Sequence, residues 1–554
     1  MTVDTAPATL VIDVFDDPMT LDPHKAFDTS SRHPVLNIYD GLLGLDEDRR
    51  PYPVLAADLP VATGRGGTWE VAIPIRGGIR FHDRTPLTVD DVVYSLRRMA
   101  ITADGPASLW ADALLGAPLT RLSEAAAAEM AGRITAGNDG VLLRLPAPYR
   151  PIDLLLVQWS LVVSRPWCAE RGEWDGDLAT VVHFLRRGRT PLDEQANGTG
   201  PYALHGWDRT RRVLTFRTSE ARTSAARGGP AATVVLRSVD DRRERERELL
   251  AGECDFSVCQ PESRRRLGRL EGIVLEKLPE EWSINPLGFI TQRLDPRCAA
   301  VGSGVFGPGG LPPAAFGDVH LRRMLSLCFD HAAYVDDVLD GEALTHSPPF
   351  PAGAIRGLDV GRGIFDPDLA RAEWSSAWDG HAASAGCRIV ITTHAANISR
   401  VRAAEYLARG LRAVSDGIEV EIDAVDFNTL NERLYAGQCP VAFVGWASDF
   451  LHPFAFASAL LDPRAPLPAA LGIDDAVLAD LVLRARQAEP EEEAAVYRRM
   501  AEYAADQALF LAPPGKISYM TYADRWQGVR LKHHVPNVLD FASFRARVEA
   551  ERPE

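Results

Sequence analysis

The chain has 554 residues, of which 46% are hydrophobic and 25% are charged, a composition typical of a folded globular protein. Its 76 acidic residues outnumber its 60 Lys and Arg and give a formal net charge of −16, which argues against nucleic acid or an anionic membrane surface as the main partner. No uninterrupted run of about 18 apolar residues occurs, so we expect no membrane-spanning helix. The length favours three or four domains, or two large ones.

The N-terminus lacks the basic stretch and apolar core of a secretory signal, and strand-like sequence begins by Thr9. The protein is therefore either cytosolic, or an export segment was removed or never included. The seven cysteines are odd in number and scattered along the sequence. This usage predicts buried free thiols in a reduced compartment.

Strand and helix patterns alternate along the chain, which favours an α/β fold. Thr88 and Asp91 form a T-x-x-D capping arrangement that starts a helix. Further on, a strand over Ala232–Arg237, a charged helix over Arg242–Leu250 and a strand over Asp255–Val258 follow one another.

Three segments are rich in glycine and proline. Asn197–Tyr202 (NGTGPY) predicts a tight turn, which either presents backbone amides to a ligand or only redirects the chain. We expect Gly302–Pro313 and Pro348–Gly363 to be loops.

The clearest alternation predicts a βαβαβ succession that ends near Trp446. Strands are expected at Arg388–Thr392, Ile418–Asp423 and Val441–Trp446, with helices near Ala404–Val414 and Thr429–Ala436 between them. The last strand is apolar throughout, as is typical of a strand buried on both faces. The succession implies parallel pairing with right-handed crossovers.

The sequence offers no recognisable catalytic set, cofactor motif or metal site. It contains no H-E-x-x-H, paired C-x-x-C, P-loop or G-x-S-x-G motif. Gly302–Gly307 matches G-x-G-x-x-G, but no strand leads into it and a proline-rich stretch follows. His452, three residues from Asp449, leaves a metal-binding variant as a minor option.

Asp449 is the most informative single residue. It lies three residues past Trp446, at the carboxyl end of a buried strand, where open α/β sheets bind their ligands. The other interpretation is a helix N-cap for the segment that begins at Pro453. Trp446 and Phe450 could supply apolar walls of a pocket, although core packing explains Trp446 equally well.

Six segments follow the order of the motifs of one known family. They are Leu21–His24 with Asn37–Leu42, Ile75–Leu96, Gly198–Tyr202, Leu249–Asp255, Leu321–His331 and Gly445–Asp449. Together they resemble the extracytoplasmic solute-binding proteins of peptide-type ABC importers, the oligopeptide-, dipeptide- and nickel-binding group (family 5). The resemblance covers essentially the whole chain.

The resemblance implies a two-lobed, type II periplasmic-binding-protein-like α/β clamshell with an extra domain inserted in the first lobe. We expect lobe I to comprise residues 1–38, 190–277 and 512–554, the inserted domain residues 39–189, and lobe II residues 278–511.

The function implied by the resemblance is that of a monomeric, non-catalytic receptor. It would capture a peptide or peptide-like molecule in a cleft between the lobes, outside the cytoplasm, and deliver it to an ABC permease and ATPase. Asp449 would accept the ligand's α-ammonium, and Trp446 would line a side-chain pocket. The other implied contacts are Gly445, Ala447, Phe450, Phe27, Thr29, Trp282 and Asn285.

One departure concerns the charge of the site. Oligopeptide receptors have a basic residue near the Gly-Trp segment, where this chain has Phe443 and Val444. A free ligand carboxylate is therefore not favoured by the resemblance. The missing signal and the seven cysteines keep an alternative open: a cytosolic protein that reuses the fold as an enzyme, carrier or ligand sensor in a specialised pathway.

Overall fold

The computed structural model divides into two units, each with its own sheet and core. The first comprises Met1–Leu278, Asp449–Leu451 and Ser518–Glu554, and the second Pro279–Ser448 and His452–Ile517. The described residues are 9–65, 68–102, 106–119, 122–180, 188–219, 231–259, 263–278, 282–360, 363–532, 535 and 538–547. The expected division of the first unit into a lobe and an inserted domain stays a prediction.

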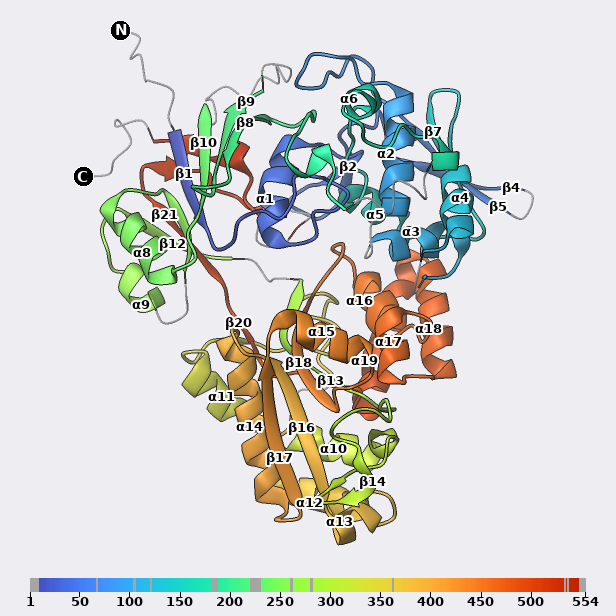
Figure 1. Cartoon of the computed structure of the whole chain (residues 1–554), viewed down its shortest axis with the longest axis vertical. Coiled ribbons are helices and arrows are strands. Elements are labelled where there is room, and N and C mark those ends of the chain that lie inside the picture. Colours follow the sequence, from blue (N-terminus) through green and yellow to red (C-terminus); the bar gives the residue numbers. More distant parts are fainter. Residues whose placement is uncertain are drawn as a thin grey trace. The chain divides into compact units, whose positions relative to one another are not determined.

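The first unit contains a seven-stranded mixed sheet (Figure 1). Its order is β12 (Ile273–Lys277), β21 (Tyr519–Ala523), β11 (Phe256–Cys259), β1 (Thr9–Val14), β10 (Thr233–Ser238), β9 (Val213–Thr218) and β8 (Tyr202–Asp208). Strands β10 and β11 both run parallel to β1. Helix α8 (Arg242–Ala251) joins them and ends at Gly252 in the left-handed conformation, which confirms the predicted strand–helix–strand succession.

A second, antiparallel sheet of this unit has the order β4 (Val61–Arg65), β5 (Thr68–Pro74), β7 (Gly140–Leu145) and β6 (Ile134–Ala136). The helices are α1 (Thr29–Ile38), α2 (Val89–Thr102), α3 (Pro106–Leu115), α4 (Glu124–Gly132), α5 (Ile152–Gln158), α6 (Arg165–Glu170) and α9 (Arg264–Leu267). Helix α2 starts as predicted, because the Asp91 carboxylate accepts hydrogen bonds from the Thr88 amide and hydroxyl at 2.9 and 2.6 Å.

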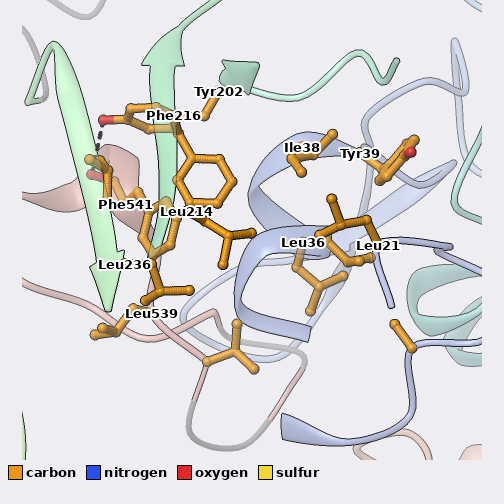
Figure 2. Packing of buried hydrophobic residues seen from close by; sticks show 14 of the residues in the cluster. Leu21, Leu36, Ile38, Tyr39, Tyr202, Leu214, Phe216, Leu236, Leu539 and Phe541 are labelled. Carbon is orange, nitrogen blue, oxygen red and sulfur yellow. Dashed lines mark hydrogen bonds between the residues drawn. The ribbon is translucent and has the colours of Figure 1, made fainter. Parts of the chain in front are cut away.

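Helix α1 packs its apolar side chains against the sheet. Figure 2 shows Leu36 and Ile38 from the helix close to Leu214 of β9, with the Phe541 ring alongside. The Tyr202 hydroxyl donates to the Phe541 carbonyl at 3.3 Å, the dashed bond in Figure 2. This packing fixes the position of the loop that precedes α1 and of the helix start, which carry the predicted contact residues Phe27 and Thr29.

The predicted turn Asn197–Tyr202 packs against the carboxyl end of α1. The Gly200 amide donates to the Ile38 carbonyl at 2.8 Å, and a Cβ on Gly198 would lie only 2.1 Å from that same oxygen. The Gly198 carbonyl accepts from the His82 amide at 2.9 Å. The turn therefore uses its backbone groups within the fold, which favours the chain-redirecting interpretation.

A buried ion network ties the L-D-P-H segment to α2. Arg98 donates to both carboxylate oxygens of Asp22 at 2.8 and 2.6 Å and to Glu173 at 3.2 Å, and all three side chains are fully buried. Burial raises the pKa of Asp22, but the charge and hydrogen bonds of Arg98 outweigh it and lower that pKa to about 2. Burial lowers the pKa of the adjoining His24 to about 4.

The second unit is built on a five-stranded sheet with the order β17 (Ile418–Val425), β16 (Cys387–His394), β18 (Val441–Ala447), β13 (Ser283–Ile290) and β19 (Phe510–Leu511). Strand β16 pairs in parallel with both β17 and β18, which confirms the predicted parallel pairing. Figure 1 shows α14 (Ile398–Val414) running along the pair β16–β17. Helix α15 (Phe427–Tyr435) begins two residues before the expected start, because Asp426 caps it.

The second unit also contains further helices and two short strands. They are α10 (Val319–Leu327), α11 (His331–Val338), α12 (Pro367–Ser376), α13 (His381–Ala385), α16 (Pro453–Leu460), α17 (Pro466–Leu471), α18 (Ala476–Gln487), α19 (Pro490–Asp506), β15 (Ala343–Leu344) and β20 (Gly515–Lys516). The expectation of a loop throughout Gly302–Pro313 was wrong, since β14 occupies Gly302–Gly307. Its glycines at 302 and 304 take left-handed φ values of 52° and 75°, which propensity alone does not reveal.

Two further expectations concern the side chains and the membrane. Six cysteines are buried free thiols in the described part of the chain: Cys168, Cys254, Cys298, Cys328, Cys387 and Cys439. Within the same residues, no helix has the length and apolar character to cross a membrane.

Candidate functional site

Asp449 lies two residues past the end of β18, close to the predicted position, and its contacts group it with the first unit. Its main-chain carbonyl accepts a hydrogen bond from the indole Nε1 of Trp159, the residue after α5, at 3.0 Å. The N-cap of α16 is His452, whose Nδ1 accepts from the Phe454 amide at 3.2 Å. The N-cap interpretation of Asp449 was therefore wrong.

Aromatic and cationic side chains surround this acid. The guanidinium carbon of Arg32, on α1, lies 4.6 Å from the centroid of the Trp159 ring. Phe27 packs on the same indole with ring centroids 5.5 Å apart. Asp28 holds the start of α1 by accepting from the Ser31 amide at 2.8 Å. The loop and first turn of α1 thus present Phe27 and Arg32 to one indole.

The electrostatics of Asp449 are those of a desolvated acid beside one cation. Burial raises its pKa to about 6, and the charge of Arg32 works in the opposite direction. Burial lowers the pKa of Arg32 to about 10, while Asp449 and Asp28 both act to raise it. No donor among the described residues is hydrogen-bonded to the Asp449 carboxylate, so its oxygens are available to a ligand donor.

In the second unit, five predicted residues lie on or beside the paired strands β13 and β18. Ser283 pairs with Ala447 and Ile284 with Trp446, and the register then shifts before Leu287. The Ser448 amide donates to the Trp282 carbonyl at 2.8 Å, which extends the pairing by one residue.

Trp446 combines core packing with an unused donor. Its ring meets the buried Phe289 edge-on, with centroids 6.3 Å apart. Its indole nitrogen is buried and has no hydrogen-bond partner among the described residues. A buried donor without a partner costs about 1–3 kcal/mol, so this nitrogen is a candidate for a ligand acceptor.

Arg400, near the start of α14, is a candidate contact residue that the sequence did not indicate. Its Nε donates to the Asn285 Oδ1 at 2.9 Å, and a Cβ on Gly445 would lie 2.7 Å from one guanidinium nitrogen. Burial lowers its pKa to about 10, and no described carboxylate forms an ion pair with it. The motif positions Phe443 and Val444 are instead buried core residues.

The structure thus gathers the predicted residues into two separate sets. The first unit holds Asp449, Phe27, Thr29 and Phe450; Thr29 is exposed at the start of α1 and Phe450 is buried. The second unit holds Trp282, Asn285, Gly445, Trp446 and Ala447. The sequence did not indicate three residues that contact these sets, because none of them lies in a recognisable motif: Arg32, Trp159 and Arg400. No cluster suited to a metal ion occurs among the described residues.

A family model described as bacterial extracellular solute-binding proteins, family 5 Middle, matches residues 50–466, more than half of the chain. Among curated proteins, the chain is 26% identical over 543 residues to "Protein XP55" of Streptomyces lividans, covering 95% of this chain and 86% of that protein.

Two solved structures show the same fold at low identity. One is the dipeptide-binding protein of Pseudoalteromonas sp. SM9913 in complex with Met-Leu, at TM-score 0.73, 18% identity, and coverage of 97% of this chain and 100% of that one. The other is the ABC transporter-associated periplasmic binding protein of Helicobacter pylori with peptide STSA, at TM-score 0.72, 18% identity, and coverage of 97% and 98%. They confirm the predicted α/β periplasmic-binding-protein-like fold.

Proposed function

This chain belongs to the bacterial extracellular solute-binding proteins of family 5, and on that premise we propose that it captures a peptide or peptide-like molecule for ABC-type import. The carrying observation is the Asp449 carboxylate, half-buried at the end of β18 and without a bonded donor among the described residues. A ligand ammonium supplies the missing donors and the opposite charge. Phe27, against Trp159, adds apolar surface nearby.

The position of Arg400 favours a ligand that also carries an anionic group or a strong hydrogen-bond acceptor. A desolvated guanidinium without a described carboxylate partner is electrostatically incomplete, and a carboxylate matches its planar donors. Because Gly445 has no side chain, the Arg400 guanidinium can lie close to the backbone of β18. The sequence at Phe443 and Val444 did not favour a ligand with a free carboxylate. We revise that expectation, because Arg400 on α14 supplies a positive charge that those positions lack.

We assign the capture to the outside of the cytoplasm and the delivery to an ABC permease and ATPase, with a monomeric receptor. The family description, extracellular solute binding, supports the location. Two structural neighbours, one an ABC transporter-associated binding protein with peptide STSA and the other a dipeptide-binding protein with Met-Leu, support the ligand class and the route. No finding favours the enzyme, carrier or sensor alternative.

The proposal is tested by calorimetry with Met-Leu and Ser-Thr-Ser-Ala, each in free and N-acetylated form. We expect the free peptides to bind and acetylation to weaken binding, because it removes the ammonium. Asp449→Asn should cost roughly 2–5 kcal/mol of binding free energy for the free peptides and little for the acetylated ones.

The matched control is Asp416→Asn, a carboxylate on the exposed connection between α14 and β17. It should bind both peptide forms as the wild type does. Equal affinity of the Asp449→Asn variant and the wild type for a free peptide would remove Asp449 from the site.

A further inference from the structure

Trp159 and Arg32 meet Asp449 in two different ways. The indole holds the main chain of Asp449 through its Nε1–H donor, at 3.0 Å. The guanidinium of Arg32 stacks on the ring of Trp159, 4.6 Å from the ring centroid. Its positive charge acts on the Asp449 carboxylate. One contact therefore fixes where the acid is, and the other affects whether it is ionised.

The stack itself is held from both sides. Trp159 is 3% exposed and Arg32 is 8% exposed, so neither side chain has the freedom of a surface residue. Phe27 covers the indole with ring centroids 5.5 Å apart, and Asp28, the N-cap of α1, acts electrostatically on Arg32. A planar guanidinium on an indole face is a favourable cation–π arrangement.

Among the described residues, few charged groups influence the Asp449 carboxylate. Arg32, from α1, is the charged group that acts on Asp449, and Asp28 acts in turn on Arg32. His452, three residues on, contacts Glu493 at 2.8 Å within the second unit. Loss of Arg32 would therefore leave desolvation unopposed at the Asp449 carboxyl.

We propose that Trp159 and Arg32 are positioning residues, which hold Asp449 in place and keep it ionised so that it binds a cationic ligand group near neutral pH. The ligand role rests on the proposed function, whereas the effect of Arg32 on the ionisation of Asp449 is a property of the ligand-free protein. The inference assigns a ligand-tuning role to the indole after α5 and to Arg32 in the first turn of α1, neither of which belongs to a recognisable sequence motif.

The direct test follows the Asp449 carboxyl in the ligand-free protein by NMR of ¹³C-labelled aspartate, with Asp449→Asn identifying the signal. The wild-type midpoint is expected near pH 6. Arg32→Met should raise it by roughly one unit or more, the usual effect of removing an opposite charge at short range. Arg32→Lys, which keeps the charge, should return it toward the wild-type midpoint.

Trp159→Phe separates the two roles, because it keeps an aromatic face and removes the donor. It should leave the midpoint nearly unchanged and weaken binding of a free peptide about fivefold at every pH, the value of one neutral hydrogen bond. Circular dichroism on each variant checks that it is folded. If Arg32→Met failed to fold, Arg32→Gln would serve the same purpose.

An unchanged midpoint in the folded Arg32→Met or Arg32→Gln protein would overturn the role of Arg32. Full peptide affinity in Trp159→Phe would overturn that of Trp159. A wild type that titrates as expected but binds neither Met-Leu nor Ser-Thr-Ser-Ala would leave the Arg32 assignment supported and count against the proposed function instead.

Discussion

At the scale of single residues, the proposed peptide binding uses two desolvated charged side chains, Asp449 in the first unit and Arg400 in the second. Asp449 was predictable, because a carboxylate just after an all-apolar strand lies where α/β folds bind ligands. Arg400 and Trp159 were not, because each comes from a distant segment and becomes relevant only through tertiary packing. Sequence spacing carries no information about such contacts.

Binding of amine-bearing peptides should depend on pH through Asp449. The ligand ammonium needs the ionised carboxylate, and the pKa of this group in the free protein is about 6. The association constant should therefore fall as the pH drops below about 6, approaching tenfold per unit, and stay level from pH 6.5 to 7.5. Calorimetry from pH 5 to 7.5 measures it, and N-acetylated peptides should lack this dependence.

Gly445→Ala should act on the ligand's anionic end. The new Cβ would lie 2.7 Å from a guanidinium nitrogen of Arg400 and 3.0 Å from the Asn285 Oδ1, so the flexible guanidinium must move. We expect a stability change below about 1 kcal/mol, since the displaced group is a side-chain end. Affinity for a peptide with a free carboxylate should fall, whereas its C-terminal amide should be nearly unaffected. Arg400→Met should reproduce this selectivity; equal losses for both peptides would contradict it.

At the scale of elements, periodicity predicted most of what the structure contains. The apolar run Val441–Trp446 and the alternation over Ile418–Asp423 gave strands in the expected parallel arrangement, because each pattern matches one burial geometry. The short strand Gly302–Gly307 was missed, since a glycine-rich segment shows no hydrophobic alternation. The turn Asn197–Tyr202 was found, but whether its amides serve a ligand or the fold depended on its neighbour α1.

Gly198→Ala should destabilise the first unit through that turn. Its Cβ would be 2.1 Å from the Ile38 carbonyl oxygen, which is backbone at the end of α1 and cannot swing aside. A loss of about 1–3 kcal/mol in unfolding free energy is expected, as for other overpacked sites. Denaturant titration measures it against Gly206→Ala, where no atom lies within 4 Å of the new Cβ. Equal stability of the two variants would show that the turn relaxes freely.

At the scale of the whole molecule, the sequence predicted the fold class but not what stabilises the L-D-P-H segment. That segment was recognisable as a motif, yet its partners lie far away in the sequence, Arg98 on α2 and Glu173 in the loop after α6. The buried network makes folding sensitive to acid. Asp22 is ionised and His24 neutral in the folded protein at neutral pH, because their pKa values are lowered to about 2 and about 4.

Thermal stability should therefore decrease as the pH falls from about 6.5 toward 2. The unfolded chain binds a proton at the histidine below about 6.5 and at the aspartate below about 4, while the folded protein takes up each only at lower pH. Differential scanning calorimetry should show a smaller acid-induced drop in melting temperature for Asp22→Asn with Arg98→Met than for the wild type. If the melting temperature of the double variant fell with pH as steeply as that of the wild type, other groups would control acid unfolding.

The six buried thiols of the described residues should react slowly with oxidants and alkylating agents while the protein is folded. Burial raises the pKa values of Cys168, Cys328, Cys387 and Cys439 to about 12. Since the thiolate is the reactive form, roughly one such group in 10⁵ is poised to react at pH 7 while the chain stays folded. Alkylation of these four thiols by iodoacetamide is then expected to require opening of the fold, so its rate reports unfolding without an engineered probe.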